Sequence, residues 1–456
     1  MPIDRRAQRL LDEYAGFGVP PLATLSPQEA RKQPTLDDAI KVMLQKEGEP
    51  VTPEPVGSFE DMTLPGKEIP VRIYQPGSQG PYPVLVYFHG GGWVLGSPAF
   101  CDAACRALTN LAQCIVVSVD YRLAPEHPFP AAVDDAFDTL QWVLENAPSI
   151  GGDPQRVAVG GESAGGNLAT VATLRARDEG KPLPIYQVLV YPVLNYAFDT
   201  PSYTENADAR PLSRESMRWF WKHYLPNEEA GTHPYASPLR AESLAGLPPA
   251  LVITAEYDPL RDEGEAYAQR LSEAGVPVVL SRYKDMTHQF FAMLPVVEDA
   301  HKAVLEVAAG LRSAFSREPQ ATQAQRPEGA KVADWGVLAE TPSGMGSEAE
   351  APGFQPVKEG ELVPGVGEMA GTPHLAGSAQ AVGHPEMFIG MAVVGSDGTP
   401  LGQVIAVYEH GVLVERHMQR DLIVPFEALS LQGGQGILSL PADQADAPGW
   451  GASSVM

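Results

Sequence analysis

Between residues 84 and 315, short apolar runs alternate with longer amphipathic segments, and this alternation limits the chain to few architectures. The apolar runs have the length and the Val, Ile and Leu content of buried strands, whereas the segments between them have helical spacing. Parallel strands are reached through crossover connections, so this order predicts an α/β fold with a doubly wound, mainly parallel sheet. The predicted strands cover residues 71–74, 84–88, 114–119, 157–159, 186–191, 250–255 and 278–283, and the predicted helices cover 131–146, 164 onward, 261–274 and 295–315.

Residues 161–165 read GESAG and connect a predicted strand to the helix that begins at Ala164. A G-x-S-x-G sequence in this strand-turn-helix context is typical of a nucleophile elbow, in which a strained turn exposes the serine hydroxyl. The flanking glycines are needed because a side chain there would collide with neighbouring backbone. The helix N-terminus adds partial positive charge near a developing oxyanion. The pattern therefore indicates Ser163 as a nucleophile.

Residues 89–93 read HGGGW and directly follow the predicted strand at 84–88. Consecutive glycines let backbone N–H groups turn toward one point, as an oxyanion hole requires. The alternative, a phosphate-binding loop, lacks the Lys-Ser/Thr ending of a P-loop and the G-x-G-x-x-G spacing of a dinucleotide site. We expect His89 to anchor this loop rather than to act as a base.

A serine hydroxyl needs a base to take its proton, and that base needs an acid to orient it. Asp258, in EYDPLRDEG, and His288, in DMTHQF, each follow one of the last two predicted strands, where a parallel sheet collects catalytic groups. Glu256 and Asp262 are competing acids, but the first lies beside a strand end and the second lies inside a predicted helix. The other histidines lack the combination of a loop after a strand and a position downstream of the acid.

Five sequences occur in a fixed order: HGGGW, DYRLAPEHPFPAA at 120–132, GESAGG, DPLRDEG and THQF. With them, residues 1–315 resemble the bacterial hormone-sensitive-lipase-like (family IV) esterases of the α/β-hydrolase fold. The resemblance implies a helical cap over the sheet, the chain order Ser, acid, His, hydrolysis of short- to medium-chain acyl esters, and no metal or organic cofactor. It also implies that the backbone N–H groups of Gly91, Gly92 and Ala164 form the oxyanion hole. The chain departs from the family pattern at Glu162, where Asp is usual, and at Gln289, where Gly is usual.

Changes in composition divide the first two thirds of the chain into a cap and a catalytic domain. Residues 1–55 carry two amphipathic segments, at 5–14 and 26–45, which we expect to be cap helices. The catalytic domain is expected at 56–316. It is interrupted at about 196–239 by an aromatic-rich stretch without a strand pattern, which we interpret as a cap insertion. We expect its aromatic side chains mainly to pack, and lining of the substrate cleft is the alternative.

The remainder of the chain has a different character. Residues 317–384 are dominated by Ala, Gly, Pro, Gln and Glu, a composition typical of a flexible linker. Residues 385–445 resemble a PRC-barrel-like module, and a small all-β domain without a ligand is the alternative interpretation. The strands predicted there cover residues 391–394, 404–408, 412–415, 422–425 and 437–440.

Charge and cysteine content exclude several classes of partner. The formal net charge of −25 argues against nucleic acid and anionic membranes, because both would be repelled. Three cysteines, Cys101, Cys105 and Cys114, are too few and too close for a disulfide framework and lack histidines at metal-ligand spacing, which predicts buried thiols. The charged N-terminus has no signal-peptide core, and no apolar run has spanning length, so we expect a cytoplasmic protein.

Together these features predict a serine carboxylesterase with a Ser163, His288 and Asp258 triad and an acyl-enzyme intermediate. An amidase or peptidase would use the same groups and is an alternative. A non-catalytic small-molecule receptor on this fold, such as the gibberellin receptors, would typically have a broken triad, and an interfacial lipase would need an apolar lid in place of the charged N-terminal segment. The expected ligand is a small-molecule ester; a homodimer and a partner of the C-terminal module stay open.

Overall fold

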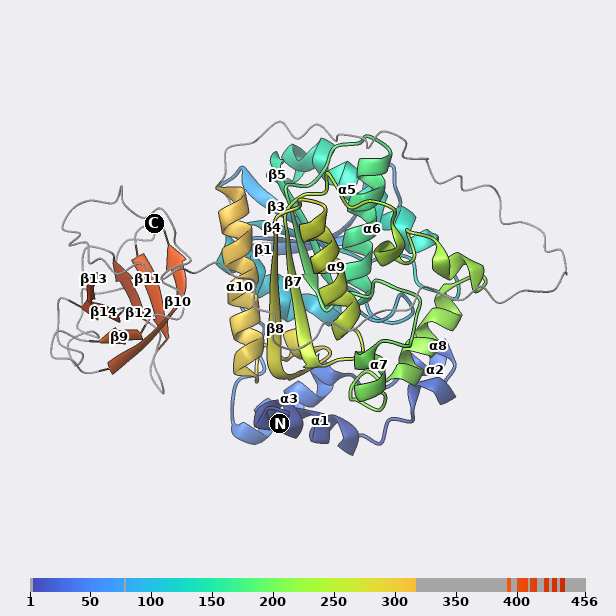
Figure 1. Ribbon diagram of the computed structural model, residues 1–456, viewed down its shortest axis with the longest axis horizontal. Helices are drawn as coiled ribbons and strands as arrows, with labels where there is room; N and C mark the ends of the chain where they lie inside the picture. The colour runs from blue at the N-terminus through green and yellow to red at the C-terminus, as the bar shows by residue number, and fades with distance from the viewer. Residues whose placement is uncertain are drawn as a thin grey trace, which may run out of the picture. The chain divides into compact units, whose positions relative to one another are not determined.

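The computed structural model describes residues 3–77 and 79–316 and six strand segments between residues 392 and 438 (Figure 1). The chain divides into two compact units, Met1–Pro356 and Val357–Met456. The residues predicted to form the linker, 317–384, lie outside the described residues. Within the described part of the chain, no helix is long and apolar enough to cross a membrane.

The first unit is built on an eight-stranded sheet with the order β1-β2-β4-β3-β5-β6-β7-β8. Strands β4, β3, β5, β6, β7 and β8 run parallel to one another, whereas β2 is antiparallel to both of its neighbours, β1 and β4. The predicted mainly parallel α/β sheet is thus confirmed. The strands are β1 Ser58–Thr63, β2 Pro70–Gln75, β3 Tyr82–Phe88, β4 Ile115–Val119, β5 Gly152–Glu162, β6 Tyr186–Val190, β7 Ala250–Tyr257 and β8 Val278–Thr287.

Strand β1 was not predicted, and its burial explains the omission. Five of its six residues are exposed, so its sequence SFEDMT carries no apolar face for a pattern to reveal. The strand exists because it pairs along its whole length with β2. Edge position, rather than side-chain burial, decides its structure.

Helices cover both faces of the sheet, as the alternating pattern predicts (Figure 1). One apolar core contains side chains from α5, α6 and α9, and a second contains side chains from α4 and α10. These helices are α4 Asp102–Ala112, α5 Ala131–Asn146, α6 Ala164–Asp178, α9 Arg261–Glu273 and α10 Glu298–Phe315. Short 3-10 turns lie at Leu22–Thr24, Pro98–Cys101, Ala147–Ile150, Glu229–Thr232, Pro238–Arg240 and Phe290–Met293.

Helices from two separate parts of the chain gather at one end of the sheet (Figure 1). They are α1 Arg5–Gly16, α2 Pro27–Ala30 and α3 Leu36–Glu47 from the N-terminal segment, and α7 Pro201–Glu205 and α8 Arg214–Tyr224 from the insertion. The indole Nε1 of Trp219, on α8, donates to the Leu25 carbonyl oxygen at 3.0 Å and joins the two parts.

The single helical segment predicted at 26–45 is wrong, because the structure has two helices there, α2 and α3. Pro34 lies between them and cannot donate to a helical hydrogen bond. Thr35 then caps α3: its hydroxyl accepts from the backbone N–H of Asp38, and the Asp38 carboxylate accepts from the Thr35 N–H. A Pro-Thr-Leu-Asp-Asp sequence is thus a helix start inside an apparently continuous amphipathic pattern.

The strands described in the second unit form one six-stranded sheet with the order β12-β11-β10-β9-β14-β13. Only the β14 and β9 pair is parallel. The strand β13 was not predicted, and the PRC-barrel resemblance stays a prediction. The strands are β9 Ala392–Val394, β10 Pro400–Tyr408, β11 Gly411–Glu415, β12 Leu422–Pro425, β13 Leu429–Gln432 and β14 Gln435–Leu438.

Candidate active site

Ser163 lies on a sharp turn between β5 and α6. Its φ of 57° and ψ of −120° place it in a strained region of backbone space. The turn passes so close to β3 that a β-carbon on Gly165 would lie 1.9 Å from the carbonyl oxygen of Phe88. Only glycine fits there, and the close approach keeps the serine hydroxyl at the end of the sheet.

His288 and Asp258 reach Ser163 from the next strands of the sheet. Asp258 follows β7, and His288 follows β8. The Nδ1 of His288 lies 2.7 Å from Oδ2 of Asp258, and its Nε2 lies 3.0 Å from Oγ of Ser163. All three side chains are buried. With Nδ1–H donating to the carboxylate, Nε2 is free to accept the serine proton, as general-base activation of a nucleophile requires.

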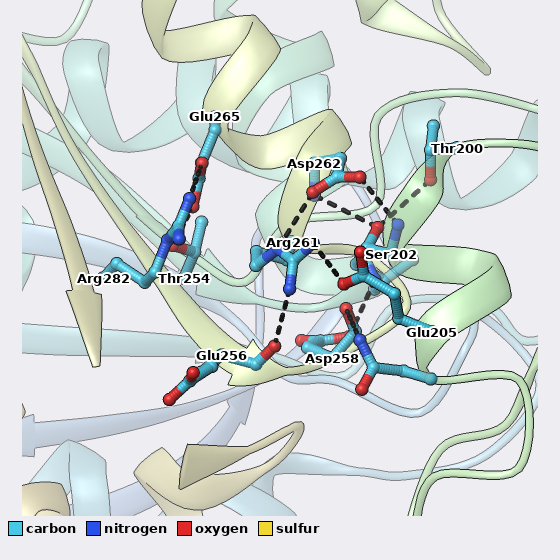
Figure 2. A network of polar contacts seen from close by, with 12 residues as sticks. Thr200, Ser202, Glu205, Thr254, Glu256, Asp258, Arg261, Asp262, Glu265 and Arg282 are labelled. Carbon is cyan, nitrogen blue, oxygen red and sulfur yellow. Dashed lines mark hydrogen bonds and ion pairs between the residues drawn. The ribbon is translucent and has the colours of Figure 1, made fainter. Parts of the chain in front are cut away.

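The two competing acids are engaged elsewhere. The carboxylate of Glu256 accepts the backbone N–H of Asp285 at 2.8 Å. Asp262 forms an ion pair with Arg261 at 2.9 Å (Figure 2). The structure therefore brings Asp258, and neither neighbour, to the imidazole.

The HGGGW loop lies beside Ser163. Gly91 and Gly92 have φ values of 112° and 59° and line the same cavity as Ser163 and His288. A β-carbon on Gly92 would lie 2.1 Å from a ring carbon of Phe220, so the cap insertion packs directly on this loop. Ala164 is the first residue of α6, and its N–H is among those that a helix leaves without an intrahelical acceptor. These positions suit an oxyanion hole made of the Gly91, Gly92 and Ala164 N–H groups.

His89 is held away from the reacting groups. Its ring is fully buried and stacks on Tyr121 with centroids 4.3 Å apart. Its Nδ1 lies 2.6 Å from the Gly90 carbonyl oxygen. Burial lowers the pKa of His89 to about 4, because the low-dielectric surroundings disfavour the cation. The ring is therefore neutral at ordinary pH and ties the glycine loop to the core.

A cavity of about 1760 Å³ opens onto the triad and is walled by both parts of the cap. Its apolar wall includes Leu22 and Leu25 from the N-terminal segment and Met217 and Phe220 from α8. The aromatic side chains of the insertion were expected mainly to pack, with cleft lining as the alternative. Phe220 does both, because it is part of the apolar core and also lines the cavity. Charged side chains, among them Asp37, Lys41 and Glu215, also line the cavity, so its wall is partly apolar and partly polar.

Sequence reasoning noted Glu162 only as a departure from the family pattern, and it missed Tyr191. The Tyr191 hydroxyl donates to Oε2 of Glu162 at 2.7 Å, and its ring lies 4.5 Å from that of His288. Burial raises the pKa of Glu162, while the Tyr191 bond and the nearby His288 oppose this shift. Tyr191 therefore contacts both Glu162 and the imidazole of His288.

Gln289, where the family pattern has glycine, has a left-handed backbone conformation. Its φ is 64°, in the region that favours glycine. The strained backbone of Gln289 directly follows His288.

The three cysteines, predicted to be buried thiols, are free and buried.

Comparison with known proteins shows that the chain is similar to esterases of the alpha/beta hydrolase fold. The family model for the alpha/beta hydrolase fold matches residues 85–292. Carboxylesterase NlhH of Mycobacterium tuberculosis is 47% identical over 252 residues, which cover 54% of this chain and 79% of the relative. The arylesterase of Saccharolobus solfataricus is 39% identical over 293 residues, 64% of this chain and 92% of the relative.

Solved structures agree with the sequence relatives. The hyperthermophilic esterase of the archaeon Pyrobaculum calidifontis superposes with a TM-score of 0.62 and is 41% identical, covering 69% of this chain and 99% of the esterase. About a third of this chain has no counterpart in that esterase. On this evidence, the chain belongs to the α/β-hydrolase fold family, in its hormone-sensitive-lipase-like branch, and is a carboxylic ester hydrolase.

Proposed function

We propose that the chain is a serine carboxylesterase that hydrolyses short- to medium-chain acyl esters of small molecules through an acyl-enzyme on Ser163. The observation that carries this proposal is the continuous relay from Asp258 Oδ2 through His288 to Ser163 Oγ, with separations of 2.7 and 3.0 Å. Both separations are within hydrogen-bond reach before any substrate arrives.

In the first half of the reaction, Ser163 Oγ attacks the ester carbonyl carbon while His288 Nε2 accepts the hydroxyl proton. Asp258 holds the tautomer and stabilises the imidazolium. The tetrahedral oxyanion takes hydrogen bonds from the Gly91, Gly92 and Ala164 N–H groups, each worth roughly 3 kcal/mol in such sites. The alcohol leaves with the proton from His288.

In the second half, water replaces the alcohol. His288 takes a proton from the water, which attacks the acyl carbon, and the same donors stabilise the second oxyanion. Collapse of this intermediate breaks the bond to Ser163 Oγ, which regains its proton from His288. The products are a carboxylic acid and free enzyme.

The test is hydrolysis of p-nitrophenyl esters from acetate to palmitate by the wild type and by Ser163→Ala. We expect turnover of the short and medium esters and its loss in the variant. A matched p-nitroanilide series separates an esterase from an amidase, because the amine is the poorer leaving group. No turnover of any ester by folded wild type, or undiminished turnover by Ser163→Ala, would contradict the proposal.

A further inference from the structure

The short segment between β7 and α9 carries Asp258, and side chains hold its backbone on both sides of that residue. Residues 256–260 comprise the last two residues of β7 and the three residues before α9. Three side chains donate to carbonyl groups of this stretch: Arg261 Nη1 to that of Glu256 at 3.1 Å, Ser202 Oγ to that of Pro259 at 2.7 Å, and Asn206 Nδ2 to that of Asp258 at 3.4 Å. The Asp258 carbonyl also accepts the backbone N–H of Arg261 at 3.2 Å.

Two of these three donors belong to the cap insertion. Ser202 is in α7, and Asn206 directly follows it. Ser202 also bonds reciprocally with the start of α9: its N–H donates to Oδ2 of Asp262 at 2.7 Å, and its hydroxyl accepts the Asp262 N–H at 3.3 Å. Helix α7 and the residue after it are thus attached to the backbone of the catalytic acid and to the residues that follow it (Figure 2).

Arg261 connects the same parts from the other side. Its Nη2 forms an ion pair with Glu205 of α7 at 2.8 Å, and its Nε pairs with Asp262 at 2.9 Å. Its side chain is only 13% exposed, so the guanidinium is largely shielded from water, and its fork spans α7, α9 and the end of β7 (Figure 2). A planar fork can hold three partners in a fixed geometry, which a single ammonium group cannot.

We propose that Ser202, Asn206 and Arg261 form a brace through which the cap insertion positions Asp258 for its contact with His288. This rests on the proposed function, because it assumes that Asp258 serves His288. Asp258 makes two side-chain contacts, with Leu260 N–H at 2.8 Å and with His288 at 2.7 Å, and both depend on where its backbone lies. The three brace residues touch no reacting atom, so they are positioning residues. The cap insertion therefore has two tasks, to wall the cavity and to hold the acid.

The first test is the variant Arg261→Ala, measured with a short p-nitrophenyl ester. We expect kcat to fall about 10- to 100-fold, as displacements of about 1 Å do in other enzymes, while KM stays within about twofold. Arg261→Lys keeps the positive charge but not the planar fork, so its kcat should lie between those of the wild type and Arg261→Ala. Ser202→Ala, a smaller change at a buried site, should show the same pattern more weakly.

The pH profile of kcat/KM separates positioning from loss of folded protein. His288 must be neutral to act, and the Asp258 carboxylate, 2.7 Å from its Nδ1, stabilises its cation. A displaced Asp258 stabilises the cation less, so the acid limb of the profile should move to lower pH in Arg261→Ala. A fall in kcat that only follows the folded fraction, with an unmoved acid limb, would overturn the proposal.

A matched control and a double-mutant cycle complete the test. Arg282 pairs with Glu265 of α9 (Figure 2). Within the described part of the chain, its side chain forms no hydrogen bond or ion pair with residues 256–260, so Arg282→Ala should leave kcat and KM unchanged. In an Asp258→Asn background, Arg261→Ala should lower kcat little further, because its effect on kcat depends on Asp258. An equal fold-decrease in kcat in both backgrounds would overturn the proposal that the brace positions Asp258. Inactive wild type would instead overturn the proposed function.

Discussion

Buried groups around the triad carry much of the chemistry at the residue scale. Glu162 directly precedes Ser163, His89 anchors the glycine loop, and both side chains are buried. Burial acts on them in opposite senses, because it always disfavours the charged form. It raises the pKa of the carboxyl group and lowers the pKa of the imidazole. Stability and activity near this site therefore depend on pH through different residues.

His89 gives a stability prediction whose sign can be worked out. Its pKa is about 4 in the folded protein and about 6.5 in an unfolded chain. Between these values the unfolded state binds a proton that the folded state does not, so the free energy of unfolding rises with pH. The contribution of His89 to the free energy of unfolding is fully present above about pH 6.5 and is lost as the pH falls to about 4. Its size is about 3 kcal/mol.

Urea unfolding of the wild type and His89→Asn across this range measures the effect. We expect the slope of stability against pH between about 4 and 6.5 to be smaller in the variant by about one proton. His301→Asn, at an exposed position of α10, is the matched control and should leave the slope unchanged. Equal slopes in the wild type and His89→Asn would show that His89 does not titrate in this way.

At the scale of elements, the N-terminal cap depends on one arginine for its attachment near the cavity. Arg31, at the end of α2, donates to the carbonyl oxygens of Val94 at 2.9 Å and Ala124 at 2.8 Å. It also forms a two-pronged ion pair with Glu126, and this pair lowers the pKa of Glu126 to about 2. Arg31 also lines the cavity. Its removal should therefore change the cavity wall more than the hydrogen bonds of the triad.

We therefore expect Arg31→Ala to raise KM by about tenfold for medium-chain esters, since hydrogen bonds to charged groups contribute about 1.5 kcal/mol or more. The fall in kcat should be smaller. Steady-state kinetics across the p-nitrophenyl series measures both. Lys67→Ala, which breaks the Lys67 and Asp138 pair away from the cap, should change neither. A lower kcat with unchanged KM would contradict this interpretation.

At the scale of the whole molecule, the candidate site is complete within the first unit. The cavity is lined by residues between Arg6 and Pro295, and the last helix of this unit, α10, ends at Phe315. Residues 357–456 belong to the other compact unit. Nothing in the described site uses a residue beyond α10.

A chain ending at residue 320 should accordingly keep the kcat/KM of the full chain within about twofold, since it removes no group that contacts substrate. Its thermal unfolding midpoint should also be close to that of the full chain. Ester hydrolysis and circular dichroism of the two proteins provide the comparison. A folded but inactive short chain would show that the C-terminal part belongs to the working enzyme.

The sequence by itself determined the parallel sheet, the helix at 131–146 to the residue, and which serine, acid and histidine meet. These features depend on local patterns: apolar periodicity, glycine-rich turns, and the rule that loops after parallel strands share one edge. Only the tertiary structure decided the break between α2 and α3, the pairing of β1, the contact of Tyr191 with Glu162, and the brace around Asp258. Ser202 meets Pro259 across 57 positions of sequence. Such contacts depend on how distant elements pack, and no short stretch of sequence encodes that.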